Sequence, residues 1–334
     1  MSPPVILFHY AGSPFSKRVL DYLALRGIPY DQCLQPQILP RPDLARLGIR
    51  YRRIPLLAIG RDVYLDSRLI LQRLEQHEGN KPSFAAEASS EQRGIQKLCA
   101  SFTTDTPLFF SVVQVLLPNT PLMQNEAFMK DRTDMIGAGP GFEFSDFVLK
   151  TRAEGINYVK NAVELLETTL LADGRQWIAG GDAPTLADIE MVWPLAWLFA
   201  VPGATDPYIK KESFPKVFAW ADRFQKAVEA AQKSLRKPES LSGEQVAEIL
   251  GKATVAETAV EQNDPLVQIQ GLREGQTVQV WPTDSGAGHK TVGKLVGLTS
   301  KEIVIETTQG DVSVRVHAPR HGFRVAALEK ANLS

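Results

Sequence analysis

The sequence is poor in cysteine, which argues against both a disulfide framework and a metal site built from cysteines. Cys33 and Cys99 are the only cysteines in 334 residues, too few for a disulfide framework. Neither belongs to a Cys-x-x-Cys pair or to a cluster of cysteines and histidines, so no metal site is expected. We expect a reducing, cytoplasmic environment, with both cysteines buried as small hydrophobic side chains.

The chain also lacks a surplus of either charge and any long apolar run. Lys and Arg together number 37 and Asp and Glu 38, so the formal net charge is −1. Nucleic-acid binding through bulk charge requires an excess of basic residues, so no nucleic-acid partner is expected. The sequence contains no apolar run of about 18 residues, the length typical of a transmembrane helix. Residues 1–10 do not have the pattern of a secretion signal. Neither a membrane-spanning segment nor a secretion signal is therefore expected.

What the chain does contain is typical of a globular protein with more than one domain. Hydrophobic residues make up 44% and charged residues 22% of it, and at about 100–200 residues per domain this length predicts two or three domains. Residues 1–80 alternate strands and helices, residues 90–236 are nearly all helical, and residues 265–330 contain short strands. The polar, acidic segment 237–264 is interpreted as a linker.

The first region has the pattern of a thioredoxin-like domain. The apolar run Val5–Phe8 predicts a strand buried on both faces, and Ser13 followed by proline is a typical helix start. Residues 30–34 predict a second strand, residues 56–65 a β-hairpin, and residues 67–78 a helix. The order β-α-β followed by β-β-α is that of the thioredoxin-like fold.

The second region predicts an all-α domain. Helical periodicity covers Gln92–Leu117 and Ala153–Leu171. Thr185–Asp188 has the form of a capping box that opens an apolar helix over Ile189–Ala200. Between these helices lies Pro118–Ser145, a stretch with several glycines that we interpret as a long loop, and loops of this length are usually functional or mobile.

The third region predicts a small β-barrel of the SH3-like kind. Its short apolar segments are Val278–Val280, Leu295–Val296, Ile303–Ile305, Val312–Val316 and Phe323–Val325. Turn residues separate these segments, as in a small antiparallel barrel. His289, His317 and His321 match no zinc-ligand spacing and are expected in surface loops. Eight basic against six acidic residues from Pro265 onward give no basis for RNA binding, so a docking module is the preferred interpretation.

Ser13 is the residue to which the sequence assigns chemistry. At the start of a helix it lies beside free backbone N–H groups and the positive end of the helix dipole, which favour an anion such as a thiolate. A free thiol has a pKa of about 8.5, and lowering it by about two units requires roughly 2.7 kcal/mol of differential stabilisation. A hydroxyl that donates to sulfur supplies part of this. The alternative is that Ser13 only caps the helix.

Three short motifs bear on that choice, namely Ser13–Val19, Arg53–Leu57 and Asp66–Ile70. In this order and spacing they resemble the glutathione transferases, above all members with a catalytic serine in a Ser-Pro-Phe motif, as in the plant tau class; omega-like members have cysteine there. The likeness continues at Thr185–Ile189 and Phe214–Trp220, so it covers about residues 4–230 and implies the family's α/β and all-α domains.

The resemblance implies roles around glutathione for Ser13, Ile54, Pro55, Asp66 and Ser67. The residue that matches Ser13 hydrogen-bonds the glutathione sulfur. The bond before Pro55 is expected to be cis, with the backbone of Ile54 pairing with the ligand. The pair Asp66 and Ser67 matches the residues that hold the γ-glutamyl end. Asp66 is one methylene shorter than the more usual glutamate.

The remaining residues of the motifs leave alternatives open. Arg53 matches a basic position that often meets the glycyl carboxylate. Tyr10, at the end of the first strand, either packs or shares the role of Ser13. Ser16 stands where a second redox cysteine would be, so dithiol exchange is excluded. Six aromatic residues form the core or wall an apolar acceptor pocket: Phe109, Phe110, Phe142, Phe144, Trp193 and Trp197.

The leading hypothesis is an enzyme, a glutathione transferase. Ser13 would stabilise the thiolate of glutathione, the co-substrate, for attack on an apolar electrophile. Glutathione-dependent isomerisation is a related hypothesis, and the sequence does not distinguish it from conjugation. The alternative is a non-catalytic scaffold with the C-terminal β region as an interaction module. The resemblance also implies a homodimer.

Overall fold

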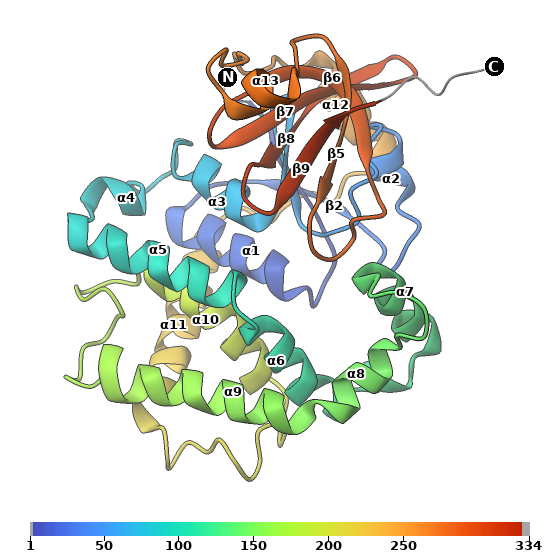
Figure 1. Ribbon diagram of the computed structural model, residues 1–334. Coiled ribbons are helices and arrows are strands. Elements are labelled where there is room, and N and C mark those ends of the chain that lie inside the picture. Colours follow the sequence, from blue (N-terminus) through green and yellow to red (C-terminus); the bar gives the residue numbers. More distant parts are fainter. Residues whose placement is uncertain (1–2, 329–334) are drawn as a thin grey trace.

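The computed structural model describes residues 3–328 and shows a nine-stranded mixed sheet with a layer of helices beneath it (Figure 1). The strand order is β2-β1-β3-β4-β8-β7-β6-β5-β9. The N-terminal elements are β1 (Val5–His9), α1 (Pro14–Arg26), β2 (Asp31–Leu34), α2 (Pro42–Ala45), β3 (Leu56–Ile59), β4 (Asp62–Leu65) and α3 (Ser67–Leu74). Strand β1 runs parallel to β2 and antiparallel to β3, which confirms the predicted thioredoxin-like order.

Local chemistry explains how this first unit forms. The Ser13 hydroxyl accepts a hydrogen bond from the Ser16 backbone N–H at 3.2 Å and so caps α1. Gly27 ends the helix in the left-handed conformation, at φ 65°. In β1, Leu7 faces one hydrophobic core, whereas Ile6 and Phe8 face another. This alternation places the strand between two packed layers.

The helical region follows with α4 (Phe84–Glu87), α5 (Ser90–Thr104), α6 (Leu108–Leu116), α7 (Glu126–Ile136), α8 (Phe144–Lys150), α9 (Arg152–Leu165), a π-helical turn (Leu166–Leu170), α10 (Leu186–Phe199) and α11 (Pro215–Lys233). Short 3₁₀ turns cover Leu117–Asn119 and Pro121–Gln124. The Asp188 carboxylate closes the predicted capping box with Thr185 and also accepts a hydrogen bond from Trp220 Nε1 at 2.8 Å. It thereby joins α10 to α11.

The prediction of a long loop over Pro118–Ser145 is wrong. Helix α7 occupies the middle of this stretch and is delimited by two local signals. Asn125 Oδ1 accepts a hydrogen bond from the Phe128 N–H at 3.0 Å, a standard N-cap. Gly137 ends the helix at φ 63°.

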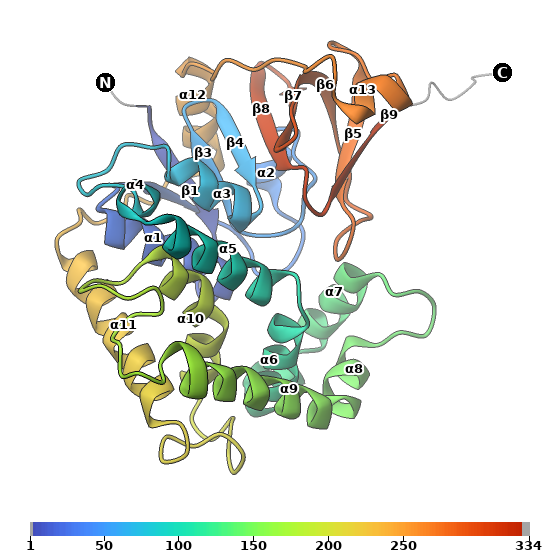
Figure 2. The same cartoon turned by 60° about the vertical axis from the view of Figure 1, so that its left-hand side comes forward.

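The C-terminal region contains α12 (Gly243–Lys252), α13 (Pro265–Gln270), β5 (Thr277–Pro282), β6 (Thr291–Leu298), β7 (Glu302–Gln309), β8 (Val312–Pro319) and β9 (Phe323–Ala327). A small β region is therefore confirmed, but a closed SH3-like barrel is not. In the described residues the sheet is open, with β2 and β9 at its edges. Strand β4 pairs in parallel with β8, residues 62–64 with 315–317. The C-terminal strands thus extend the thioredoxin-like sheet, as Figure 2 shows.

The segment 237–264, expected to be a linker, is packed into the fold. Val246 and Leu250 of α12 are buried in the same core as Ile6, Phe8 and the C-terminal strands. The Leu241 N–H also donates to the Gln32 carbonyl at 2.8 Å. The C-terminal region therefore shares a core with the N-terminal sheet, and removing it would expose apolar surface.

One histidine prediction is corrected at the junction of the two halves of the sheet. His317 was expected in a surface loop, but it lies in β8 with only 2% of its surface exposed. Its Nε2 is 2.7 Å from Asp62 Oδ1, and its Nδ1 is 3.2 Å from Glu302 Oε2. The ring packs on Tyr64 with 4.5 Å between centroids.

No single helix within residues 3–328 is long and apolar enough to cross a membrane. One bent pair, Ser90–Thr104 with Leu108–Asn119, meets the length and composition requirement together, with a 50° angle between its halves.

Candidate active site

A cavity of about 450 Å³ opens between the thioredoxin-like unit, the helical region and two turns of the C-terminal sheet. All six residues that the resemblance singles out line it: Ser13, Arg53, Ile54, Pro55, Asp66 and Ser67. They come from three places in the N-terminal unit, namely the start of α1, the segment before β3 and the start of α3. Three motifs separated in sequence therefore meet around one space.

Ser13 is held in place at the N-terminus of α1. Its side chain is nearly buried, and its oxygen accepts the hydrogen bond from Ser16. Since that bond uses a lone pair, the hydroxyl proton remains available to donate to a ligand. The neighbouring Gly12 has φ +83°, a conformation that glycine adopts without strain. The site thus offers a hydroxyl donor and a helix N-terminus at one point of the cavity wall.

Ile54 and Pro55 lie directly before β3, and the peptide bond between them is cis. This confirms the geometry that the resemblance implies for the proline. Both residues line the cavity beside Ser13.

Asp66 occupies the turn between β4 and α3 in an unusual backbone conformation. Its φ of 66° is the one positive value recorded for a non-glycine residue between residues 3 and 328. Such a conformation costs about 1–3 kcal/mol and is concentrated at functional sites. Asp66 Oδ1 accepts from the Arg68 N–H at 2.9 Å, so the carboxylate caps α3. The strain and the cap together fix the carboxylate at the cavity wall.

Ser67 is positioned from behind by a buried arginine. Arg18 Nη1 donates to Ser67 Oγ at 2.8 Å, and Arg18 Nη2 forms an ion pair with Glu190 of α10. Because Ser67 accepts from Arg18, its own hydroxyl proton is free to point into the cavity. Sequence reasoning did not single out Arg18, although it lies inside the Ser13–Val19 motif.

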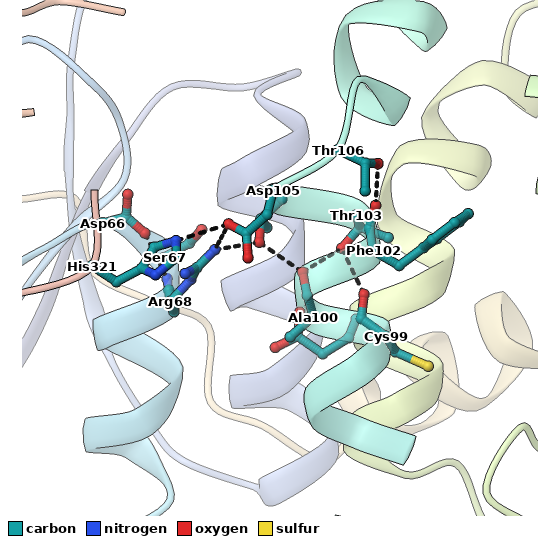
Figure 3. A network of polar contacts seen from close by, with 12 residues as sticks. Asp66, Ser67, Arg68, Cys99, Ala100, Phe102, Thr103, Asp105, Thr106 and His321 are labelled. Carbon is teal, nitrogen blue, oxygen red and sulfur yellow. Dashed lines mark hydrogen bonds and ion pairs between the residues drawn. The ribbon is translucent and has the colours of Figure 1, made fainter. Parts of the chain in front are cut away.

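A second polar network closes the same end of the cavity (Figure 3). Arg68 forms an ion pair with Asp105, the residue that ends α5, and donates to Thr104 Oγ1 at 2.6 Å. His321, from the turn between β8 and β9, lies with Nε2 3.0 Å from Asp105 Oδ1. Burial alone raises the pKa of Asp105, but the hydrogen bond and charge of Arg68 outweigh it and hold that pKa below its usual value. Asp105 therefore stays ionised at the cavity wall.

Arg53 is engaged by the C-terminal sheet. Its Nε donates to the Ser285 carbonyl at 2.9 Å, and its guanidinium forms an ion pair with Asp284. Asp66 Oδ2 lies 3.8 Å from Arg53 Nη1. Asp284 and Ser285 belong to the connection between β5 and β6 and also line the cavity. Their contribution was not predicted.

Arg41 is a further cation in the wall that sequence reasoning missed. Its guanidinium donates to the backbone carbonyls of Pro36, at 3.1 Å, of Gln37, at 3.3 Å, and of Arg52. Burial lowers the pKa of Arg41 to about 10, so it remains charged at neutral pH. No motif marks this residue in the sequence.

Aromatic side chains form a further part of the cavity wall. Of the six aromatic residues weighed from the sequence, Phe109, Phe110, Phe144 and Trp197 line it, together with Phe15. The rings of Phe15 and Phe109 lie 4.7 Å apart. Trp193 is almost fully buried behind them and packs on Phe15 at 4.6 Å.

The remaining residues considered from the sequence divide between wall and core. Tyr10 lines the cavity. Ser16 is buried in α1. Cys33 and Cys99 are buried as predicted, and burial raises the pKa of each thiol to about 12. Within residues 3–328, no group of three or more histidine, cysteine or acidic residues is arranged to hold a metal ion.

Comparisons with known proteins find relatives among the glutathione transferases. A family described as the glutathione S-transferase N-terminal domain matches residues 7–82, and a family described as a domain of unknown function matches residues 111–233. Glutathione S-transferase U1 of Arabidopsis thaliana is 33% identical over 101 residues, 30% of this chain and 44% of that protein. Glutathione S-transferase U3 of the same plant is 35% identical over 71 residues, 21% of this chain and 32% of that protein. The chain thus spans less than half the length of these relatives.

Among solved structures, a GST-like protein from Pseudomonas syringae is 25% identical with a TM-score of 0.68, and the match covers 98% of this chain and 100% of that one. The C-terminal strands are therefore included in the shared architecture. A glutathione S-transferase from Rhodospirillum rubrum is 18% identical with a TM-score of 0.50, and the match covers 71% of this chain and 95% of that one. That second match supports the fold.

Proposed function

Since this chain belongs to the glutathione transferase superfamily, we propose that it is an active glutathione transferase that uses Ser13 to stabilise the glutathione thiolate. One observation carries the proposal. Three motifs distant in sequence converge on one cavity, with the Ser13 hydroxyl at the N-terminus of α1. The hydroxyl donates a hydrogen bond to sulfur, and the helix end adds its partial positive charge.

The peptide part of glutathione is assigned to the polar part of the cavity wall. Asp66 pairs with the ligand's α-ammonium group, and Asp105 adds a second carboxylate at the same end. The Ser67 hydroxyl, with its proton left free by Arg18, donates to the ligand's γ-glutamyl carboxylate. The backbone at Ile54 pairs with the cysteinyl unit. Arg53, with its guanidinium at the cavity wall, is assigned to the glycyl end.

The aromatic part of the wall is assigned to the electrophile. Phe109, Phe110 and Trp197 offer apolar ring faces in the wall of the same cavity. In the reaction the thiolate attacks an electrophilic carbon and a C–S bond forms. Either a leaving group departs with the electron pair of its bond, or an activated double bond takes a proton from water. A cytoplasmic location and a homodimer remain predictions.

The test combines binding with turnover. Calorimetric titration of the whole protein with reduced glutathione at pH 7 is expected to show saturable binding near or below millimolar. Ser13→Ala is expected to lower the rate of conjugation to an aryl halide with little change in glutathione affinity. Ser89→Ala is the matched control, because Ser89 caps α5 with the same 3.2 Å hydrogen bond to a backbone N–H.

The outcomes separate an enzyme from a scaffold. Unchanged turnover in Ser13→Ala would remove the proposed role of that residue. Glutathione binding without conjugation or isomerisation of any electrophile tested would favour the non-catalytic scaffold. An absence of binding heat at several temperatures would mean that the ligand site has been lost.

A further inference from the structure

The connection between β5 and β6, residues 283–290, is built into the candidate active site. On one side the Gly286 N–H donates to the Met135 carbonyl of α7 at 2.6 Å. On the other, His289 Nε2 lies 3.3 Å from Arg52 Nη1. Figure 2 shows this connection descending from the C-terminal sheet toward α7. It is therefore anchored to the helical region and to the segment before β3.

This anchored connection places a carboxylate on Arg53. The Asp284 side chain forms an ion pair with the Arg53 guanidinium, and the Ser285 carbonyl accepts from Arg53 Nε at 2.9 Å. Arg53 is mostly buried, with 17% of its side chain exposed, whereas 66% of the Asp284 side chain is exposed. The cation that would meet the carboxylate of a bound peptide thus already has an anionic partner from the same chain.

Another cation of the cavity wall, Arg41, is held differently. Arg41 donates to backbone carbonyls, so its positive charge is solvated by neutral groups. At the Arg53 end, by contrast, a ligand carboxylate must share the guanidinium with Asp284 or displace it. A ligand with a neutral group at that end leaves the pair intact.

We propose that Asp284 is a specificity-determining residue that weakens selection for a C-terminal carboxylate on the thiol peptide. The site accordingly accepts thiol peptides of the γ-glutamylcysteinyl class whose glycine end is uncharged. The inference rests on the proposed function. Asp284 acts through Arg53, and because the Asp284 carboxylate is largely exposed to solvent its effect on affinity is roughly two- to fivefold.

The experiment compares two ligands on four proteins. Dissociation constants are measured calorimetrically for reduced glutathione and for its monoethyl ester, in which the glycine carboxylate is neutral. The proteins are the wild type, Asp284→Asn, Asp284→Glu and Asp311→Asn. Asp311 lies exposed in the turn between β7 and β8, so its variant makes the same charge change away from the cavity.

The quantity of interest is the ratio of the ester's dissociation constant to that of glutathione. We expect Asp284→Asn to raise this ratio roughly two- to fivefold. Asp284→Glu, which keeps the negative charge, should leave the ratio near the wild-type value, and Asp311→Asn should leave it unchanged. High salt should reduce the difference in this ratio between the wild type and Asp284→Asn. An equal ratio in wild type and Asp284→Asn overturns the inference, while glutathione binding to both proteins leaves the glutathione site of the proposed function intact. If neither ligand binds the wild type, the proposed function fails and this inference fails with it.

Discussion

Raising the pH above neutrality should weaken the junction between β4 and β8, because a buried histidine carries charge there. Burial alone would lower the pKa of His317, but its hydrogen bonds to Asp62 and Glu302 outweigh burial and raise that pKa above 6.5. Tyr64 packs on the imidazole, and the Arg73 guanidinium lies 5.5 Å from the centre of the Tyr64 ring. Protonated His317 thus joins carboxylates from both halves of the sheet.

The sign of the effect follows from proton linkage. Because the folded pKa of His317 lies above the unfolded value, its contribution is complete below pH 6.5 and is lost as the pH rises through the folded pKa. Within that window the slope is at most about 1.4 kcal/mol per pH unit for one proton. The lowered pKa of Glu302 affects stability in a lower pH range. Its contribution to the free energy of unfolding is complete above pH 4.5 and declines only as the pH falls through its folded pKa.

Urea unfolding between pH 6 and pH 9 measures this slope. The wild type should lose stability with rising pH, His317→Gln should flatten the profile, and the exposed His321→Gln should retain it. His317→Ala should lower the free energy of unfolding by about 3–5 kcal/mol at pH 6, since it leaves Asp62 buried without its partner. Parallel slopes for wild type and His317→Gln would refute the reasoning.

Two further stability predictions concern glycines and a buried ion pair. Gly94→Ala in α5 should stabilise the protein by about 0.5–1 kcal/mol, because a Cβ there meets nothing within 4 Å. Gly155→Ala in α9 should destabilise it, because a Cβ there would lie 2.8 Å from Gln114 Cβ and 3.1 Å from the Ser111 carbonyl oxygen. Thermal unfolding of both variants checks the opposite signs, and stabilisation by Gly155→Ala would contradict the packing of α9 on α6. Arg18→Met should cost about 3–5 kcal/mol, since it leaves Glu190 buried and unpaired, and the double variant with Glu190→Leu should recover most of that loss in urea unfolding. A cost below about 1 kcal/mol for Arg18→Met would mean that the pair does not carry the stability assigned to it.

The parts of the fold that sequence predicted are those with local causes. Ser13 followed by proline started α1, and Thr185 with Asp188 opened α10. Asn125 and Gly137 delimit α7 by the same rules, so that helix was within reach of the sequence and was missed because its glycine-rich surroundings favoured a loop. The continuity of the sheet was not readable, since the β4–β8 pairing joins residues about 250 positions apart through only three pairs.

In the candidate site, too, residues in local motifs were predicted, whereas residues brought in by the fold were missed. The residues within the three motifs were predicted, and the structure gathers them around one cavity. Asp105, Asp284 and His321 were missed because they reach the cavity from a helix end and from two turns of the C-terminal sheet. Arg41 was missed because its place depends on backbone carbonyls that only the folded chain brings together.

The central claim is that Ser13 stabilises a thiolate, and the most direct measurement is the pKa of the glutathione thiol in the complex. It is obtained from ultraviolet thiolate absorbance across pH in wild type, Ser13→Ala and Tyr10→Phe, each saturated with glutathione. A hydrogen bond to a charged group contributes about 1.5–3 kcal/mol, so the account predicts that Ser13→Ala raises the thiol pKa by about one to two units. A normal thiol pKa in the wild-type complex, or a larger rise in Tyr10→Phe than in Ser13→Ala, would contradict it.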